Sequence, residues 1–235
     1  MGVRQIFGEL SISQSTMSSV KVVLICLHAD PASPPGIGEG GGTHSYLCEL
    51  QRLYDRMGMP HLLVTRRAAP ASPEYERLSS LGELARIRIG SVGPLDKHQL
   101  DSHHAETVEQ IHCTISKWDV PTVLHSVYWN SGRAAAQISC DLGIPYVHTV
   151  ISNGWRRKIT GFDDQSPTRF DVERAVYGNA ARVFCICNQE RQDLIEEYGV
   201  APEKIEIVGR PVAPPYLKPC RDGYGVPRSV NVGRH

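Results

Sequence analysis

Short apolar runs rich in β-branched residues alternate with amphipathic helical segments along most of this chain, which restricts its fold class. The run 20–27 is almost continuously apolar, as is typical of a strand covered on both faces of a sheet. Further strands are expected at 61–65, 85–89, 122–127, 145–150, 182–187 and 204–208. Helices are expected at 43–57, 101–118, 131–142, 168–179 and 188–198, the first capped by Thr43. This order predicts an α/β fold with a Rossmann-like parallel sheet, helices on both faces and ligands at the carboxyl ends of the strands.

Changes in composition divide the chain into segments. Residues 1–19 are polar and weakly periodic, so we expect a disordered leader before a domain spanning 20–210. Prolines interrupt residues 211–228, which predicts a linker. Residues 229–235 have the pattern of a strand that the end of the chain cuts short. We therefore expect one folded domain, a linker and an incomplete strand.

Charge and cysteine content exclude several function classes. The chain has 235 residues, and its 25 basic and 25 acidic side chains balance, so bulk charge does not indicate a nucleic-acid or membrane surface. No apolar run approaches the roughly 20 residues of a membrane span, and residues 1–19 lack a signal-peptide core. We expect a cytoplasmic protein without an integral membrane span. The seven cysteines predict reduced thiols, and because no second pair accompanies Cys185 and Cys187, no metal site is expected.

A glycine cluster at residues 36–42 lies between the first predicted strand and the helix that opens at Thr43. Glycines let phosphate oxygens approach the main chain, and the start of a helix offers unpaired N–H groups with a partial positive charge. The cluster therefore predicts an anion site, with a mobile surface loop as the alternative. It also contains G-x-G-x-x-G, but about eight residues separate it from the strand, which is long for a dinucleotide fold. An NADP site remains as a minor alternative, with Arg66 and Arg67 facing the 2′-phosphate.

Two polar or aromatic groups follow predicted strands. Tyr128, Trp129 and Asn130 could hold a sugar through an aromatic face and an amide, or could instead anchor the next helix in the core. A basic run follows the strand at 145–150, in a segment expected to be a loop. Its members, Arg156, Arg157 and Lys158, suit a phosphorylated or carboxylated ligand, with a solvated surface as the alternative.

Five motifs occur together in one order: 41–50 (GGTHSYLCEL), 125–132 (HSVYWNSG), 142–149 (LGIPYVHT), 169–173 (RFDVE) and 198–205 (YGVAPEKI). In this order they resemble the amino-terminal, acceptor-side domain of retaining GT-B glycosyltransferases of family 4, over about residues 20–210. Sucrose-phosphate synthases and mycothiol-pathway glycosyltransferases are the relatives they resemble. The resemblance implies one half of a GT-B fold and transfer of a sugar from a nucleotide-diphosphate sugar to a small polar or phosphorylated acceptor. No cofactor and no metal are implied.

The resemblance also implies roles for individual residues. Gly40, Gly41, Gly42 and Thr43 would contact the donor diphosphate. The acceptor would contact His44, Tyr128, Trp129, Asn130, Arg156, Arg157 and Lys158. Arg169 and Glu173 would support the site. No catalytic residue is identified.

The chain departs from the family pattern in two ways. Val127 and Ile151 stand where relatives usually have histidines. The second domain of the family, which holds most of the nucleotide-sugar site, has no counterpart, so we expect little or no activity from the chain alone. The alternatives are a noncatalytic binding or assembly module that needs a separately encoded second half or forms a homo-oligomer, and an NADP-binding Rossmann protein.

Overall fold

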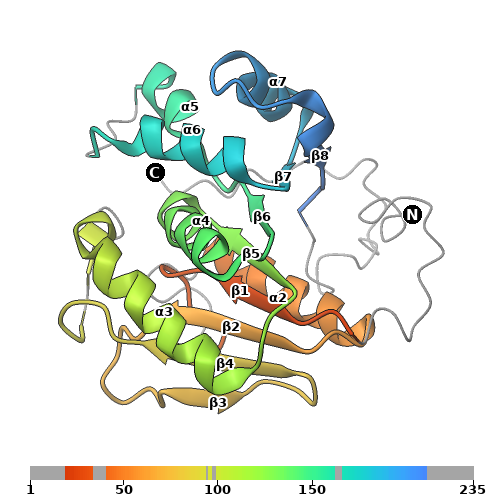
Figure 1. Ribbon diagram of the computed structural model, residues 1–235. Helices are drawn as coiled ribbons and strands as arrows, with labels where there is room; N and C mark the ends of the chain where they lie inside the picture. Colours follow the sequence, from red (N-terminus) through yellow and green to blue (C-terminus); the bar gives the residue numbers. More distant parts are fainter. Residues whose placement is uncertain (1–18, 34–40, 94, 97–98, 162–165, 211–235) are drawn as a thin grey trace, which may run out of the picture.

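A computed structural model of the protein describes residues 19–33, 41–93, 95–96, 99–161 and 166–210 (Figure 1). Eight strands form one sheet in the order β3-β4-β2-β1-β5-β6-β7-β8, and every neighbouring pair is parallel except β3 with β4. The strands are β1 (Val22–Ile25), β2 (His61–Arg66), β3 (Tyr75–Arg77), β4 (Gly82–Ile87), β5 (Val123–Val127), β6 (Tyr146–Thr149), β7 (Arg182–Cys185) and β8 (Ile205–Ile207). The predicted parallel α/β sheet is confirmed.

Helices connect the parallel strands, as the alternation predicts. They are α2 (Gly42–Arg56), α3 (His104–Trp118), α4 (Trp129–Leu142), α5 (Gly154–Ile159), α6 (Arg169–Asn179) and α7 (Asn188–Glu196), with short 3-10 turns η1 (Gln99–His103) and η2 (Pro202–Lys204). The predicted leader, except its last residue, the proline-rich linker at 211–228 and the strand-like segment 229–235 lie outside the described residues.

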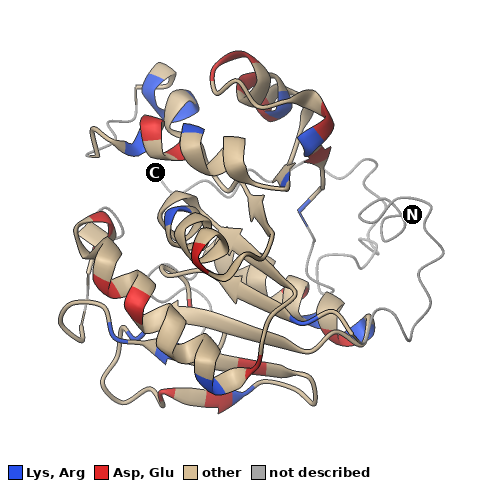
Figure 2. Cartoon of the chain, viewed as in Figure 1, with Lys and Arg blue, Asp and Glu red and all other residues tan. Residues whose placement is uncertain are grey.

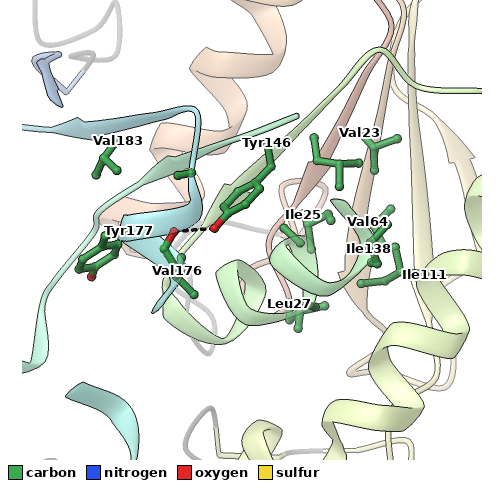
Figure 3. Packing of buried hydrophobic residues seen from close by; sticks show 14 of the residues in the cluster. Val23, Ile25, Leu27, Val64, Ile111, Ile138, Tyr146, Val176, Tyr177 and Val183 are labelled. Carbon is green, nitrogen blue, oxygen red and sulfur yellow. Dashed lines mark hydrogen bonds between the residues drawn. The ribbon is translucent and has the colours of Figure 1, made fainter. Parts of the chain in front are cut away.

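The two faces of the sheet carry separate apolar clusters, which confirms helices on both faces. In β1 and just beyond it, Val22, Leu24 and Cys26 point to one face, where Leu47 and Tyr54 of α2 cover them. The alternate residues point to the other face, against side chains of α3, α4, α6 and α7; Figure 3 shows this larger cluster. This alternation follows from the period of two residues along a strand. Strand β1 is therefore buried on both sides, as its continuous apolar run predicts.

Successive strands are added first on one side of β1 and later on its other side. Strand β2 pairs with one side of β1, and β5 pairs with the other. The connections that leave the carboxyl ends of β1 and β5 therefore diverge, which is the arrangement at which open α/β sheets bind ligands. The residues after Ile25 and after Val127 meet at this switch point.

Three local predictions differ from the structure. The cap of α2 is Gly41, not Thr43, which lies inside the first turn. Strand β3 follows a stretch rich in Pro, Ala and Ser at 68–73, in a segment for which no strand is predicted; its pairing with β4 supplies the hydrogen bonds that local propensity does not indicate. Helix α5 lies in the segment expected to be a loop, where Asn153 caps it by accepting a hydrogen bond from the N–H of Arg156 at 2.7 Å.

Acidic and basic residues are interspersed over most of the helices, whereas α5 carries three basic residues and no acidic one (Figure 2). None of the helices in the described part of the chain is long and apolar enough to cross a bilayer.

Helices α4 and α6 approach closely at Gly132, and this contact makes a stability prediction. A Cβ built at Gly132 would lie 2.6 Å from Cγ1 of Val176 and 2.9 Å from the His148 ring. We expect Gly132→Ala to lower the free energy of unfolding by about 1–3 kcal/mol in urea denaturation, because the added methyl overpacks the core. Gly178→Ala is the matched control, since a Cβ there meets nothing within 4 Å and α6 should gain about 0.5–1 kcal/mol. Equal effects of both substitutions would contradict the close approach.

Candidate functional site

The start of α2 lies beyond the carboxyl end of β1, with Gly41, Gly42 and Thr43 as its first residues. Gly41 has no side chain with which to cap the helix, and the first turn contains no acidic residue. Both glycines are exposed. Neither the cap residue nor a side chain of the first turn therefore neutralises the positive end of this helix, which suits an anion. Gly40, with the rest of the glycine cluster before Gly41, lies outside the described residues.

Arg210 lies at the same place, although nothing in the sequence analysis identified it. A Cβ built at Gly42 would be 3.7 Å from Nη1 of Arg210, and Nη2 donates a hydrogen bond of 2.7 Å to the carbonyl oxygen of Ile151. A guanidinium beside the positive end of a helix is unfavourable in isolation. An anion bound between them would reverse the sign of this interaction. The only sequence signal was a basic residue shortly after the last strand.

His44 is mostly buried, with 8% of its surface exposed. Its Nε2 lies 2.9 Å from the carbonyl oxygen of Ser33. Cys48, one turn later, donates its thiol to the carbonyl oxygen of Pro31 at 3.5 Å. The structure thus places the predicted acceptor ligand His44 against the segment that follows β1, where it ties that segment to α2.

Tyr128 lies between β5 and α4, at the switch point, and Trp129 and Asn130 are the first two residues of α4. All three are buried, and neither aromatic residue belongs to the two apolar clusters of the described residues. Tyr128 has φ of 74° and ψ of 153°, a conformation that residues with a Cβ rarely adopt. Its ring centre lies 4.6 Å from that of His28, which follows β1. Such strain concentrates at functional sites, whereas the burial of all three side chains is also what an anchor of α4 requires.

The indole Nε1 of Trp129 is buried and has no hydrogen-bond partner among the described residues. A buried donor without a partner costs free energy, because the group has lost its water. Trp129 is therefore a member of the predicted acceptor group with a buried polar atom to satisfy.

Arg169 and Glu173 form an ion pair one helical turn apart on α6, with Nε and Oε1 separated by 2.7 Å and side chains exposed by 1% and 0%. The guanidinium carbon of Arg169 lies 5.2 Å from the centre of the Tyr128 ring. Arg169 also donates a hydrogen bond of 2.8 Å to the carbonyl oxygen of Ser152. The pair therefore lies directly behind Tyr128, consistent with the supporting role expected for it.

The basic run is split by the structure. Arg156 donates two hydrogen bonds to Asp193 of α7, one of them 2.9 Å from Nε to Oδ2, so it joins α5 to α7. Arg157 is half-buried, and Lys158 is exposed. A pattern of charges along a sequence cannot show which of them are paired across space. The expectation that all three contact the acceptor is therefore weakened for Arg156.

The two arginines considered for an NADP site already donate hydrogen bonds to groups of the protein. Arg66 is buried and donates hydrogen bonds to the carbonyl oxygens of Ile89, Ser91 and Gly93. Arg67 bonds the carbonyl oxygens of Ser72 and Pro70 and the carboxylate of Glu74. These contacts disfavour the NADP alternative. In the described part of the chain, no group of three or more His, Cys, Asp and Glu side chains is placed to hold a metal ion.

Solved structures share this fold. Sucrose-phosphate synthase from Thermosynechococcus elongatus superposes with a TM-score of 0.70 at 22% identity, over 81% of this chain and 48% of that one. The likeness at this identity concerns the fold.

Curated proteins are similar in sequence. D-inositol 3-phosphate glycosyltransferase of Streptosporangium roseum is 26% identical over 223 residues, covering 90% of this chain and 51% of the relative. Mannosylfructose-phosphate synthase of Agrobacterium fabrum is 27% identical over 216 residues, covering 86% and 47%. The chain thus spans about half the length of the curated relatives it matches.

The model of the family described as "Glycosyl transferase 4-like domain" matches residues 41–211, which include every described element from α2 to β8. This match includes Gly41, Tyr128, Arg169 and Arg210. Because it covers well over half of the sequence, the chain belongs to the glycosyl transferase 4-like domain family.

Proposed function

We propose that this chain is the acceptor-side domain of a retaining glycosyltransferase, which transfers a sugar from a nucleotide-diphosphate sugar to a small phosphorylated acceptor in the cytoplasm. The observation that carries the donor side is the convergence of Arg210 and the uncapped start of α2 beside Gly42. Two positive groups meet there without an acidic residue in the first turn of the helix. A diphosphate supplies the charge that this place lacks.

The donor side would act on the leaving group. When the sugar bond breaks, the nucleoside diphosphate gains negative charge, and preorganised N–H groups and a guanidinium stabilise that charge without having to reorganise. The N–H groups of Gly42 and Thr43 and the side chain of Arg210 are assigned this role.

The acceptor side would lie at Tyr128, Trp129 and Asn130. The names of two relatives contain an inositol phosphate and a sugar phosphate product, which supports a phosphorylated acceptor. The ring of Tyr128 would pack on the sugar, the Nε1 of Trp129 would donate a hydrogen bond to it, and Arg169 would attract the phosphate from behind Tyr128. Both groups of residues lie at the carboxyl edge of the sheet, so donor and acceptor would meet at the switch point.

Calorimetric titration of the 235-residue chain tests the donor assignment. We expect inorganic pyrophosphate, UDP and GDP to bind with similar affinity, since the site holds the diphosphate, and NADP to bind no better than these. Absence of pyrophosphate binding, or a clear preference for NADP, would refute the proposal. Sugar transfer should be weak for the chain alone and should rise when a carboxyl-terminal GT-B domain is added. A stable complex with such a domain that still transfers no sugar would favour the noncatalytic assembly module.

Arg210→Ala provides a sharper test of the same site. Loss of one charged hydrogen bond to a phosphate should weaken pyrophosphate binding about tenfold in calorimetry. Arg182→Ala is the matched control, because this substitution removes the same charge at a distant place. Arg182 begins β7, at the opposite, amino-terminal edge of the sheet. Equal losses of affinity in both variants would indicate a nonspecific charge effect and would contradict the assignment of Arg210.

A further inference from the structure

Tyr198 follows α7 and is buried, with 3% of its surface exposed. Its hydroxyl donates a hydrogen bond of 2.6 Å to Oε2 of Glu173 on α6. The hydroxyl oxygen of Tyr198 also accepts a hydrogen bond of 3.0 Å from the backbone N–H of Trp155, in the first turn of α5. One hydroxyl therefore joins the end of α7, the middle of α6 and the start of α5.

Glu173 is the centre of this arrangement. Besides the Tyr198 hydroxyl, its carboxylate accepts hydrogen bonds from the N–H of Gly154 at 2.8 Å and from Nε of Arg169 at 2.7 Å. Burial raises the pKa of Glu173, and Arg169, Tyr198 and Gly154 oppose that shift. A Cβ on Gly154 would lie 3.1 Å from Oε2, so the first residue of α5 approaches closely because it has no side chain.

Arg169 carries the arrangement to the switch point. Its Nη2 donates to the carbonyl oxygen of Ser152, in the segment between β6 and α5, at 2.8 Å. Its Nη1 lies 3.4 Å from the Tyr128 hydroxyl, and its guanidinium carbon lies 5.2 Å from the ring centre. A continuous series of polar contacts thus runs from Tyr198, through Glu173 and Arg169, to Tyr128.

We propose that Tyr198 is a positioning residue of the acceptor site, whose hydroxyl holds Glu173 and the start of α5 so that Arg169 and Tyr128 keep their places. The inference rests on the proposed function, because the acceptor role of Tyr128 belongs to it. The Tyr198 hydroxyl bonds Glu173 and the N–H of Trp155, so it acts on the acceptor site through these groups. The Tyr198 hydroxyl serves the acceptor side only, since the start of α2 has no part in the series.

Tyr198→Phe removes the hydroxyl alone. Trp155 loses its acceptor and Glu173 loses one donor, so we expect the amide of Trp155 to exchange its hydrogen at least about tenfold faster. Affinity for D-inositol 3-phosphate, or for inorganic phosphate as a second probe, should fall about tenfold, while affinity for inorganic pyrophosphate stays unchanged. The matched control is Tyr146→Phe, which removes a buried hydroxyl that donates to the carbonyl oxygen of Val176 on α6 at 2.5 Å (Figure 3). This control should change neither exchange in α5 nor binding of the acceptor probes.

The outcomes separate the inference from the proposed function. Unchanged exchange at Trp155, equal loss of both classes of probe, or the same loss in Tyr146→Phe overturns the positioning role while leaving the proposed function in place. If the wild-type chain binds pyrophosphate but neither acceptor probe, the acceptor role of Tyr128 and of Tyr198 is wrong, and the donor side stands. If it binds neither class of probe, the proposed function fails and the inference falls with it.

Discussion

Replacement of Glu173 by alanine should lower the free energy of unfolding by about 3–5 kcal/mol, because it leaves the guanidinium of Arg169 buried without its counter-charge. The loss also removes the acceptor of two further hydrogen bonds, from Gly154 and Tyr198. Urea denaturation at pH 7 measures the change. This loss of stability is the cost of leaving one buried charge without its partner. It is not the net stabilisation from forming the pair, because both ions lose their water when the pair forms.

Two variants control for this interpretation. Asp119→Ala breaks the exposed pair with Lys21 and should leave the stability almost unchanged, because solvent screens that pair. The double variant Arg169→Met with Glu173→Leu removes both charges and should recover much of the loss. A small effect of Glu173→Ala, or a double variant as unstable as the single one, would contradict a charge origin.

Lowering the pH should destabilise the fold at pH values well above those at which ordinary carboxylates titrate. His125 of β5 and His148 of β6 are buried. Burial lowers the pKa of His125 to about 3, and burial together with the neighbouring His125 lowers the pKa of His148 to about 3. The unfolded chain takes up these protons near pH 6.5, whereas the native state does not. Stability is therefore fully present above pH 6.5 and is lost as the pH falls from 6.5 toward 3.

The slope rises toward about 1.4 kcal/mol per pH unit for each histidine as the pH falls below 6.5, and integration gives about 2.5 kcal/mol for both between pH 7 and 5.5. Glu173 acts in the opposite direction, because burial raises its pKa. Urea midpoints across this interval measure the net slope. A flat stability between pH 7 and 5.5 would contradict neutral, buried histidines.

His125 shows why the sequence could not predict this acid sensitivity. Its Nδ1 lies 2.6 Å from the hydroxyl of Tyr54 on α2, and its Nε2 lies 2.8 Å from Oγ1 of Thr149 on β6. These partners come from two other elements, so only the assembled fold excludes water from His125 and gives both of its ring nitrogens a partner. In the sequence His125 is one polar residue in a strand, with no local signal of its burial.

The alternation of strands and helices was accessible from the sequence, because strands repeat every two residues and helices every 3.6. The family was accessible from the order of its motifs, whereas the switch point at β1 required the strand order. The aromatic group at Tyr128 was found for a related reason, since residues that follow parallel strands meet at one edge. Strand β3 and helix α5 were missed because pairing with β4 and capping by Asn153, Glu173 and Tyr198 outweigh their weak local propensities.

The sequence by itself determined the fold class, the order of the elements and the place of the glycine cluster before α2, since these depend on periodicity and on neighbouring residues. Only the tertiary structure decided which charges are paired. In the folded protein Arg156 bonds Asp193, and Arg66 and Arg67 donate hydrogen bonds to carbonyl oxygens. Arg210 lies beside Gly42. The physical reason is that the interaction of a charge depends on distance and burial in space, and residues far apart along the chain set both.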